Sequence, residues 1–240
     1  MRAIEAIADD VSSAMRPLLF VDTCSLLDIV RAPIRLDSMD RLSRLLTSVT
    51  SLINLAKQSH PRLWMIIPLQ VQREFNENIE TVVQETIKCI EKTDCRINAF
   101  NTALQLLKPG FTPINQPFKS HDLAMLCRNL AESVMAQSVI LDEDDACKIK
   151  GMDRITSNRA PAKRGGQAKD CTILEHCLEL SQQIRNRGSQ SNLIFLTSNI
   201  EDYCDSSGAN LKTPLDVDFS AVNLSLATTW EWASSLLLDP

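Results

Sequence analysis

Residues 18–27 read LLFVDTCSLL, and the fold follows from this stretch and its counterparts further along the chain. Its first four residues are apolar without polar alternation, which is typical of a strand buried on both faces of a parallel sheet. The apolar run ends at Asp22, and Asp22 or Thr23 can cap a helix that follows over 26–30. Similar apolar runs at 63–67 and 192–196 predict two further strands of the same kind.

Helical patterns lie between and around these three runs. The apolar spacing predicts helices over 2–15, 38–58, 70–107, 119–140, 169–185 and 229–238, with a last short strand over 222–226. The stretch 141–166 is polar and contains Gly and Pro, which predicts a loop. Strands that alternate with helices indicate an α/β fold with a central parallel sheet covered on both faces. We predict a single domain over 1–240 with a long helical insertion at about 76–140.

The composition of the 240-residue chain is that of an ordinary globular protein, with 44% apolar and 23% charged residues. The net charge of −5 argues against a protein that wraps DNA tightly, and it is compatible with an enzyme that has a local basic patch. The eight cysteines form no CxxC pair and no paired Cys/His set, so a zinc site is not expected. The charged N-terminal stretch and the lack of a long apolar segment predict a cytoplasmic protein without membrane contact.

Polar side chains stand where ligands bind in such folds, beyond the carboxyl ends of the strands. Asp22 ends the first strand, Glu74 follows the second strand, and Asn199 and Asp202 follow the third. Asp170 begins the helix before the third strand, and it joins the others only if that helix starts at the same rim. Each residue also has a plain interpretation as a helix-terminal acid, a solvated helix residue or part of a turn. Their coincidence on one rim is what indicates a site.

Carboxylates that crowd on one rim repel one another, and a divalent cation removes this repulsion. Mg²⁺ prefers oxygen ligands and is often held by one or two carboxylates. A bound metal can activate water at neutral pH and stabilise the leaving oxygen of a phosphoryl displacement. The acidic residues therefore suit the hydrolysis of phosphodiester bonds.

A basic stretch precedes Asp170 in this otherwise acidic chain. Between 148 and 169, seven basic residues stand against one acid, Asp153. Contacts with nucleic-acid phosphates are predicted for Arg159, Lys163, Arg164 and Lys169. The acidic run 142–145 can pair with this basic stretch when no substrate is bound. The alternative is a solvated polar loop without a binding role.

Four segments resemble the sequence motifs of the PIN domain family. They are LFVDTCSLL at 19–27, IPLQVQREF at 67–75, GQAKDCTI at 166–173 and FLTSNIEDY at 195–203. Each motif is short, and their order and spacing over most of the chain carry the resemblance. The long helical insertion makes the chain more similar to the longer bacterial PIN-like proteins than to minimal PIN toxins.

The resemblance implies a three-layer α/β/α fold, Mg²⁺ or Mn²⁺ as cofactor, and endoribonuclease activity. Carried over to this sequence, it makes Asp22, Glu74 and Asp170 the metal-binding acids. The fourth position falls on Asn199, where Asp is usual, and Asp202 can supply the missing carboxylate. The resemblance also implies that the hydroxyls of Thr23 and Thr197 orient the acids, with simple helix capping as the alternative.

These observations predict a metal-dependent endoribonuclease that cuts RNA, with DNA as a second possible substrate. One option within this prediction is a toxin or antiphage effector held by an inhibitory antitoxin or another partner protein. The alternative is a catalytically weak or inactive PIN-like module that binds RNA or protein, which Asn199 and the helical insertion both favour. The apolar positions of the 70–107 helix can form a homodimer surface or pack on the 119–140 helix, and packing is preferred.

Overall fold

The structure is a computed structural model that describes residues 1–35, 38–57, 61–113, 116–162, 167–208 and 210–238. Within these residues, five parallel strands form one sheet in the order β3-β2-β1-β4-β5. The strands are β1 (Leu18–Val21), β2 (Trp64–Pro68), β3 (Val139–Leu141), β4 (Leu193–Leu196) and β5 (Leu224–Ala227). The chain moves outward from β1 to β3 and then returns across the sheet to β4, so its direction reverses between β1 and β4. In open parallel sheets, ligands bind beyond the carboxyl ends of the strands at such a reversal.

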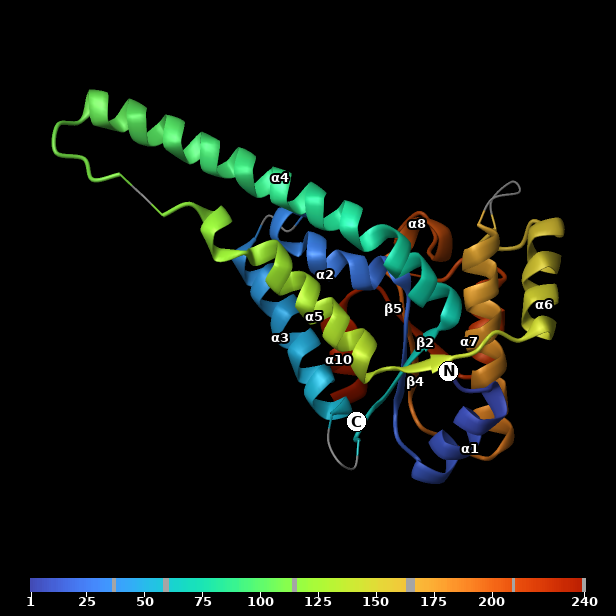
Figure 1. The fold of residues 1–240 in the computed structure, drawn as a ribbon. Helices are drawn as coiled ribbons and strands as arrows, with labels where there is room; N and C mark the ends of the chain where they lie inside the picture. The colour runs from blue at the N-terminus through green and yellow to red at the C-terminus, as the bar shows by residue number, and fades with distance from the viewer. Residues whose placement is uncertain (36–37, 58–60, 114–115, 163–166, 209, 239–240) are drawn as a thin grey trace.

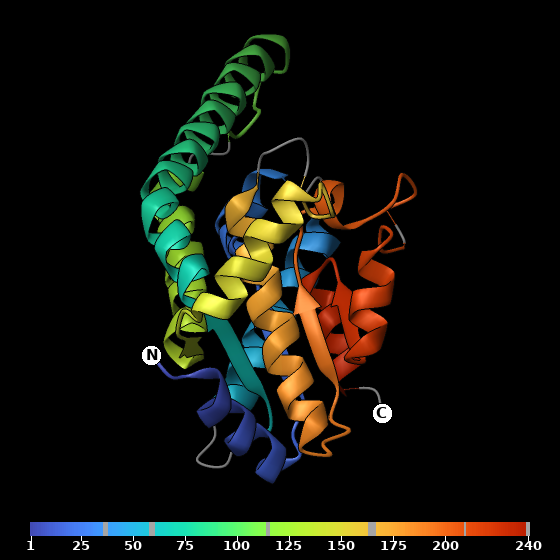
Figure 2. The same cartoon turned by 90° about the vertical axis from the view of Figure 1, so that its right-hand side faces the viewer.

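Helices cover both faces of the sheet, which confirms the three-layer α/β/α fold (Figures 1 and 2). One layer contains α2 (Thr23–Arg35), α3 (Met39–Ala56), α4 (Leu69–Leu107), α5 (Leu123–Gln137) and α10 (Trp230–Leu238). The other layer contains α1 (Ile4–Ala14), α6 (Asp145–Thr156), α7 (Ala168–Asn186) and α9 (Leu215–Ala221). Short helices η1 (Phe118–His121) and α8 (Ile200–Tyr203) lie in the connections.

The hydrophobic core contains the central strands that the sequence predicted. All four residues of β1 and all four of β4 are buried, as expected for central strands of a parallel sheet. The cysteines of the described residues are free thiols. Among the described helices, none combines the length and the apolar character that crossing a membrane requires.

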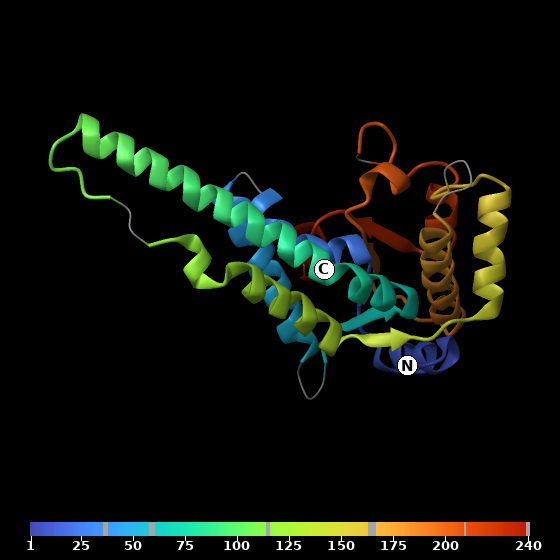
Figure 3. The same ribbon diagram turned by 45° about the horizontal axis from the view of Figure 1, so that its top comes forward.

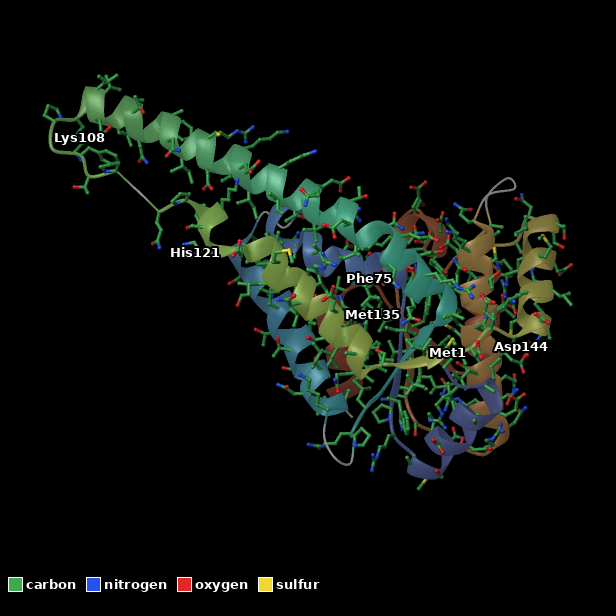
Figure 4. All side chains as sticks on the ribbon, in the orientation of Figure 1. Met1, Phe75, Lys108, His121, Met135 and Asp144 are labelled. Atoms are coloured by element: carbon green, nitrogen blue, oxygen red, sulfur yellow. The ribbon has the colours of Figure 1, made fainter. Side chains whose placement is uncertain are left out.

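The long helical insertion is formed by α4, the segment after it, and α5. With 39 residues, α4 is about 58 Å long and projects beyond the sheet (Figures 3 and 4). Its first half packs on α2 and α5 and buries Phe75 and Val82, so the preferred packing on α5 is present there. Near the far end, which Lys108 marks in Figure 4, Phe100, Leu104 and Leu107 are exposed.

The predicted loop over 141–166 is wrong at 145–156, because α6 occupies these residues. Asp144 caps this helix by accepting a hydrogen bond from the amide of Cys147 at 2.9 Å. Gly151 lies within the predicted loop. In the structure it allows close packing of α6 on α7. A Cβ atom there would lie 3.1 Å from the hydroxyl oxygen of Thr172. Helix α6 is therefore stabilised by its packing on α7, which local sequence does not show.

Other predicted bounds also differ from the structure. The predicted 119–140 helix ends at Gln137, and its last residues form edge strand β3, which pairs with β2 through Ile66 and Val139. A three-residue apolar run fits a helix end and an edge strand equally well. Helix α2 is longer than the predicted 26–30 segment and includes Pro33.

Candidate active site at the carboxyl ends of the strands

The reversal of strand order brings Asp22 and Thr197 together. Asp22 follows β1 and Thr197 follows the neighbouring strand β4. The Asp22 amide continues the ladder by donating to the Leu196 carbonyl at 3.0 Å. The Thr197 hydroxyl then donates to Asp22 Oδ2 at 2.7 Å, although 175 positions separate the two residues. The register of two central strands thus fixes this pair.

The Asp22 carboxylate is buried and hydrogen-bonded on both oxygens. Its Oδ1 accepts from the Thr23 amide at 2.7 Å, and its Oδ2 also accepts from the Cys24 thiol at 3.1 Å. Burial raises the pKa of Asp22 above its usual value, the hydrogen bonds from Thr197, Cys24 and Thr23 oppose this, and the Glu74 carboxylate adds to the rise. The site therefore holds an acid whose charge is poorly compensated by the protein alone.

Glu74 reaches the same rim from the start of α4. The Thr23 hydroxyl donates to Glu74 Oε2 at 2.7 Å, and the Gln70 amide donates to Oε1 at 2.9 Å. The Lys169 ammonium lies 4.0 Å from the same Oε1. The Glu74 side chain is 13% exposed, so it has a fixed position at the edge of the site.

Asn199 and Asp202 form a pair after β4. The Asn199 side-chain amide donates to Asp202 Oδ2 at 2.7 Å, and the Gln167 amide donates to Oδ1 at 3.1 Å. Asp202 is buried, with 7% of its surface exposed. Asn199 therefore orients a carboxylate here, and its own side chain adds no charge.

Asp170 lies in the first turn of α7, near enough to Asp22, Glu74 and Asp202 for their charges to act on it, so this helix starts at the same rim. Its pKa is raised from 3.8 to about 7, first by burial and then by the carboxylates of Asp22, Glu74 and Asp202, while Lys169 opposes the rise. The acids that sequence analysis selected thus act on one another, and the structure brings them together. We call Asp22, Glu74, Asp170 and Asp202 the acidic cluster.

Tyr203 is buried near Asp22 and Asp170 of the acidic cluster. The ring packs against Phe195 with centroids 5.3 Å apart. The hydroxyl has no hydrogen-bond partner among the described residues. Burial, Asp22 and Asp170 raise the pKa of Tyr203.

A family model for the PIN domain matches residues 19–203. This chain belongs to the PIN domain family. The matched range begins one residue into β1 and ends at Tyr203, so it contains every residue of the acidic cluster. PIN domains are generally nucleases and typically use divalent metal ions. The sequence matches no curated protein and no solved structure.

The residue types of this PIN domain fit a divalent cation, because the cluster offers hard oxygen donors in excess of positive charge. Burial and mutual repulsion raise the pKa values of Asp22 and Asp170, and a bound cation would relieve this repulsion. Among the described residues, no three Asp, Glu, His or Cys side chains are placed as ligands of one ion. The acidic cluster therefore fits a divalent cation by the chemistry of its oxygen donors and by its charge. A bound ion would draw the carboxylates closer.

The basic residues between 148 and 169 of this PIN domain differ in burial and in ion-pair partners. Arg154 is buried and pairs with Glu175 and Asp218, so its grouping with a solvent-exposed basic loop is wrong. Arg159 lies 3.4 Å from Asp218, and Lys169 lies 3.3 Å from Glu77 beside the cluster. Lys163 and Arg164 lie outside the described residues. The acidic run does pair with part of the stretch, since Lys148 lies 2.9 Å from Glu143.

Sequence reasoning missed three supporting residues. The Cys24 thiol donates to Asp22 and contacts the Thr197 hydroxyl at 3.2 Å. Burial and the Asp22 charge raise the pKa of Cys24, which keeps it a neutral thiol. Gln70 and Gln167 orient Glu74 and Asp202. Only Gln70 carries a local signal, because it stands one helical turn before Glu74.

Proposed function

We propose that this PIN domain is a metal-dependent endoribonuclease that hydrolyses phosphodiester bonds in RNA. The observation that carries the proposal is Asp170, an acid at the helix start whose pKa is raised first by burial and then by three neighbouring carboxylates. Such an arrangement costs the folded protein free energy, and a divalent cation would offset this cost. Perturbed acids of this kind gather at functional sites.

The side chains have distinct roles in this proposal. Asp22 and Asp170 would hold Mg²⁺ or Mn²⁺, and Glu74 and Asp202 would complete the site. A bound ion would supply a water of lowered pKa and stabilise charge on the leaving oxygen. Thr23 and Thr197 hold the carboxylates of Glu74 and Asp22 in place, as hydroxyl donors at 2.7 Å.

Asn199 stands where the family usually has Asp, and its contacts suggest a positioning role. It donates to Asp202, which lies within the group of carboxylates that raise the pKa of Asp170. We infer that Asp202 replaces the usual fourth acid and that Asn199 fixes its rotamer.

Cleavage that depends on a divalent metal ion is the direct test. Purified protein is incubated with single-stranded RNA and DNA in the presence of Mn²⁺, Mg²⁺ or EDTA. We expect RNA to be cut with either ion and to remain intact in EDTA. Cutting of DNA alone would reassign the substrate, and cutting that continues in EDTA would contradict the metal mechanism.

The affinity for metal is expected to depend on pH through Asp170. A cation must displace the proton from this carboxyl, whose pKa is about 7 in the metal-free protein. Below pH 7, the apparent affinity for Mn²⁺ should therefore fall about tenfold per pH unit, and it should level off above pH 8. Calorimetry at pH 6, 7 and 8 in buffers of different ionisation enthalpy measures both affinity and proton release. An affinity that is constant over this range would contradict the assignment.

A second candidate function is a PIN module that binds RNA or a partner protein without cutting. Asn199 and the exposed Phe100, Leu104 and Leu107 at the far end of α4 favour it, because apolar side chains on a projecting helix are typical of interaction surfaces. An inhibitory antitoxin, if the chain is a toxin or antiphage effector, would cover the acidic rim. Absence of both cleavage and Mn²⁺ binding under all conditions would favour this candidate over the nuclease.

A further inference from the structure

A cavity of about 580 Å³ lies at the carboxyl ends of β4 and β5, which is the edge of the sheet that also carries the acidic cluster. Its wall includes Ser25, two residues after Thr23, and Ser198, the residue after Thr197. From this rim the cavity follows α2 as far as Arg35. Ten residues of α-helix rise about 15 Å, so the cavity leads from Ser25 at the rim to a point about 15 Å away at the end of α2.

The far part of the cavity is rich in arginine. Arg35 comes from the end of α2, and Arg41 and Arg44 come from the first turns of α3. Two acids also line the wall, and one of them, Asp28, accepts from Arg35 at 2.5 Å. Arg44 is exposed and has no ion-pair partner among the described residues. None of these arginines belongs to the basic stretch that the sequence indicated.

The inner wall combines apolar surface with an unpartnered hydroxyl. Ala32, Leu45 and Trp230 supply the apolar part, and the Trp230 indole donates to the Ser25 carbonyl at 3.1 Å, which fixes that wall. The Ser25 hydroxyl is buried and has no hydrogen-bond partner among the described residues. The surface that this wall offers to a ligand is therefore apolar, because the Ser25 hydroxyl is not accessible to solvent.

We propose that this cavity is a substrate subsite that takes one nucleotide of single-stranded RNA, with a phosphate at Arg44 and the base against the apolar wall. Its volume lies within the range of small-ligand pockets, which suits a single nucleotide. A single strand can turn an unstacked base into such a cavity, whereas a base paired in a duplex cannot leave its stack without cost. The planar guanidinium of arginine matches phosphate geometry.

This inference rests on the proposed function, because it names the strand that the acidic cluster would cut. The subsite can nevertheless be tested without cleavage. In EDTA, the protein is titrated into a fluorescein-labelled 12-nucleotide single-stranded RNA, and binding is followed by anisotropy at several salt concentrations. A duplex of the same sequence is the second probe.

Arg44→Glu is the test variant, and Arg96→Glu is its matched control, since Arg96 is an exposed arginine on the far half of α4. We expect Arg44→Glu to weaken binding of the single strand about tenfold and to lower the salt slope by about 1 or more. Arg96→Glu should leave both unchanged. Thr228→Trp fills the cavity without changing charge and should also weaken binding of the single strand.

The subsite would be overturned if Arg44→Glu and Arg96→Glu weakened binding equally, or if Thr228→Trp bound the single strand as tightly as the wild type does. It would also be overturned if the duplex bound as tightly as the single strand. Failure of the nuclease proposal looks different. In that case the wild-type protein cuts nothing in Mn²⁺ or Mg²⁺, while single-strand binding still depends on Arg44.

Discussion

Asp170→Asn is expected to abolish RNA cleavage and, at the same time, to stabilise the metal-free protein. Removal of a partner that only orients a metal ligand costs about 10–100-fold, so loss of the ligand itself should cost at least about a hundredfold in rate. The gain in stability follows from the raised pKa. A carboxyl whose folded pKa of about 7 lies above its ordinary 3.8 favours folding below pH 4, and this contribution is lost as the pH rises to 7.

At pH 8 the wild-type carboxylate is ionised and repelled by its neighbours, whereas the asparagine amide is neutral. We expect Asp170→Asn to gain about 2 kcal/mol at pH 8 in EDTA, or about 4–8 °C in Tm for a chain of this size. At pH 4 the gain should vanish, because Asp170 is then protonated in the wild type. Added Mn²⁺ should raise the Tm of the wild type and not that of the variant.

Asp145→Asn is the matched control, since the Asp145 side chain is 93% exposed and lies outside the cluster. It should change neither cleavage nor the pH dependence of Tm. Retained cleavage by Asp170→Asn would remove Asp170 from the active site. A variant that is less stable than the wild type at pH 8 would show that Asp170 has a structural role instead.

Arg154→Ala is expected to destabilise the protein strongly without a direct effect on RNA contacts. The guanidinium pairs with Glu175, donates to Asp218 at 2.7 Å and donates to the Ala160 carbonyl at 3.0 Å. Because Arg154 is 3% exposed and Glu175 is 8% exposed, the variant leaves a buried carboxylate without its partner. Breaking a buried pair in this way costs about 3–5 kcal/mol, which corresponds to a fall in Tm of about 10 °C.

Lys150→Ala provides the comparison, because Lys150 forms an ion pair with Glu179 at the surface. Such exposed pairs contribute about 0–1 kcal/mol. Thermal unfolding of both variants, together with RNA binding per folded molecule, separates the two roles. If Arg154→Ala lost RNA affinity and kept its Tm, the residue would be a phosphate contact and not a structural one.

The strands and the acids that follow them could be predicted because both depend on local sequence. An apolar run without polar alternation is recognisable as a buried parallel strand, and the end of such a strand marks the rim where ligands bind. Asp22, Glu74 and Asp202 were found in this way. Arg154 shows the limit of local reasoning, since a row of basic residues does not reveal that one of them turns inward onto α7 and α9.

The sequence by itself determined the class of fold, the family, and which acids are candidates for the active site, because apolar periodicity and motif order are properties of neighbouring residues. Tertiary structure alone decided that 145–156 is helical, since α6 depends on the close approach of Gly151 to Thr172. It also decided that α7 begins at the acidic rim and that arginines from α2 and α3 line a cavity next to it. These features depend on contacts between residues far apart in the chain, and only the packing of the layers brings such residues together.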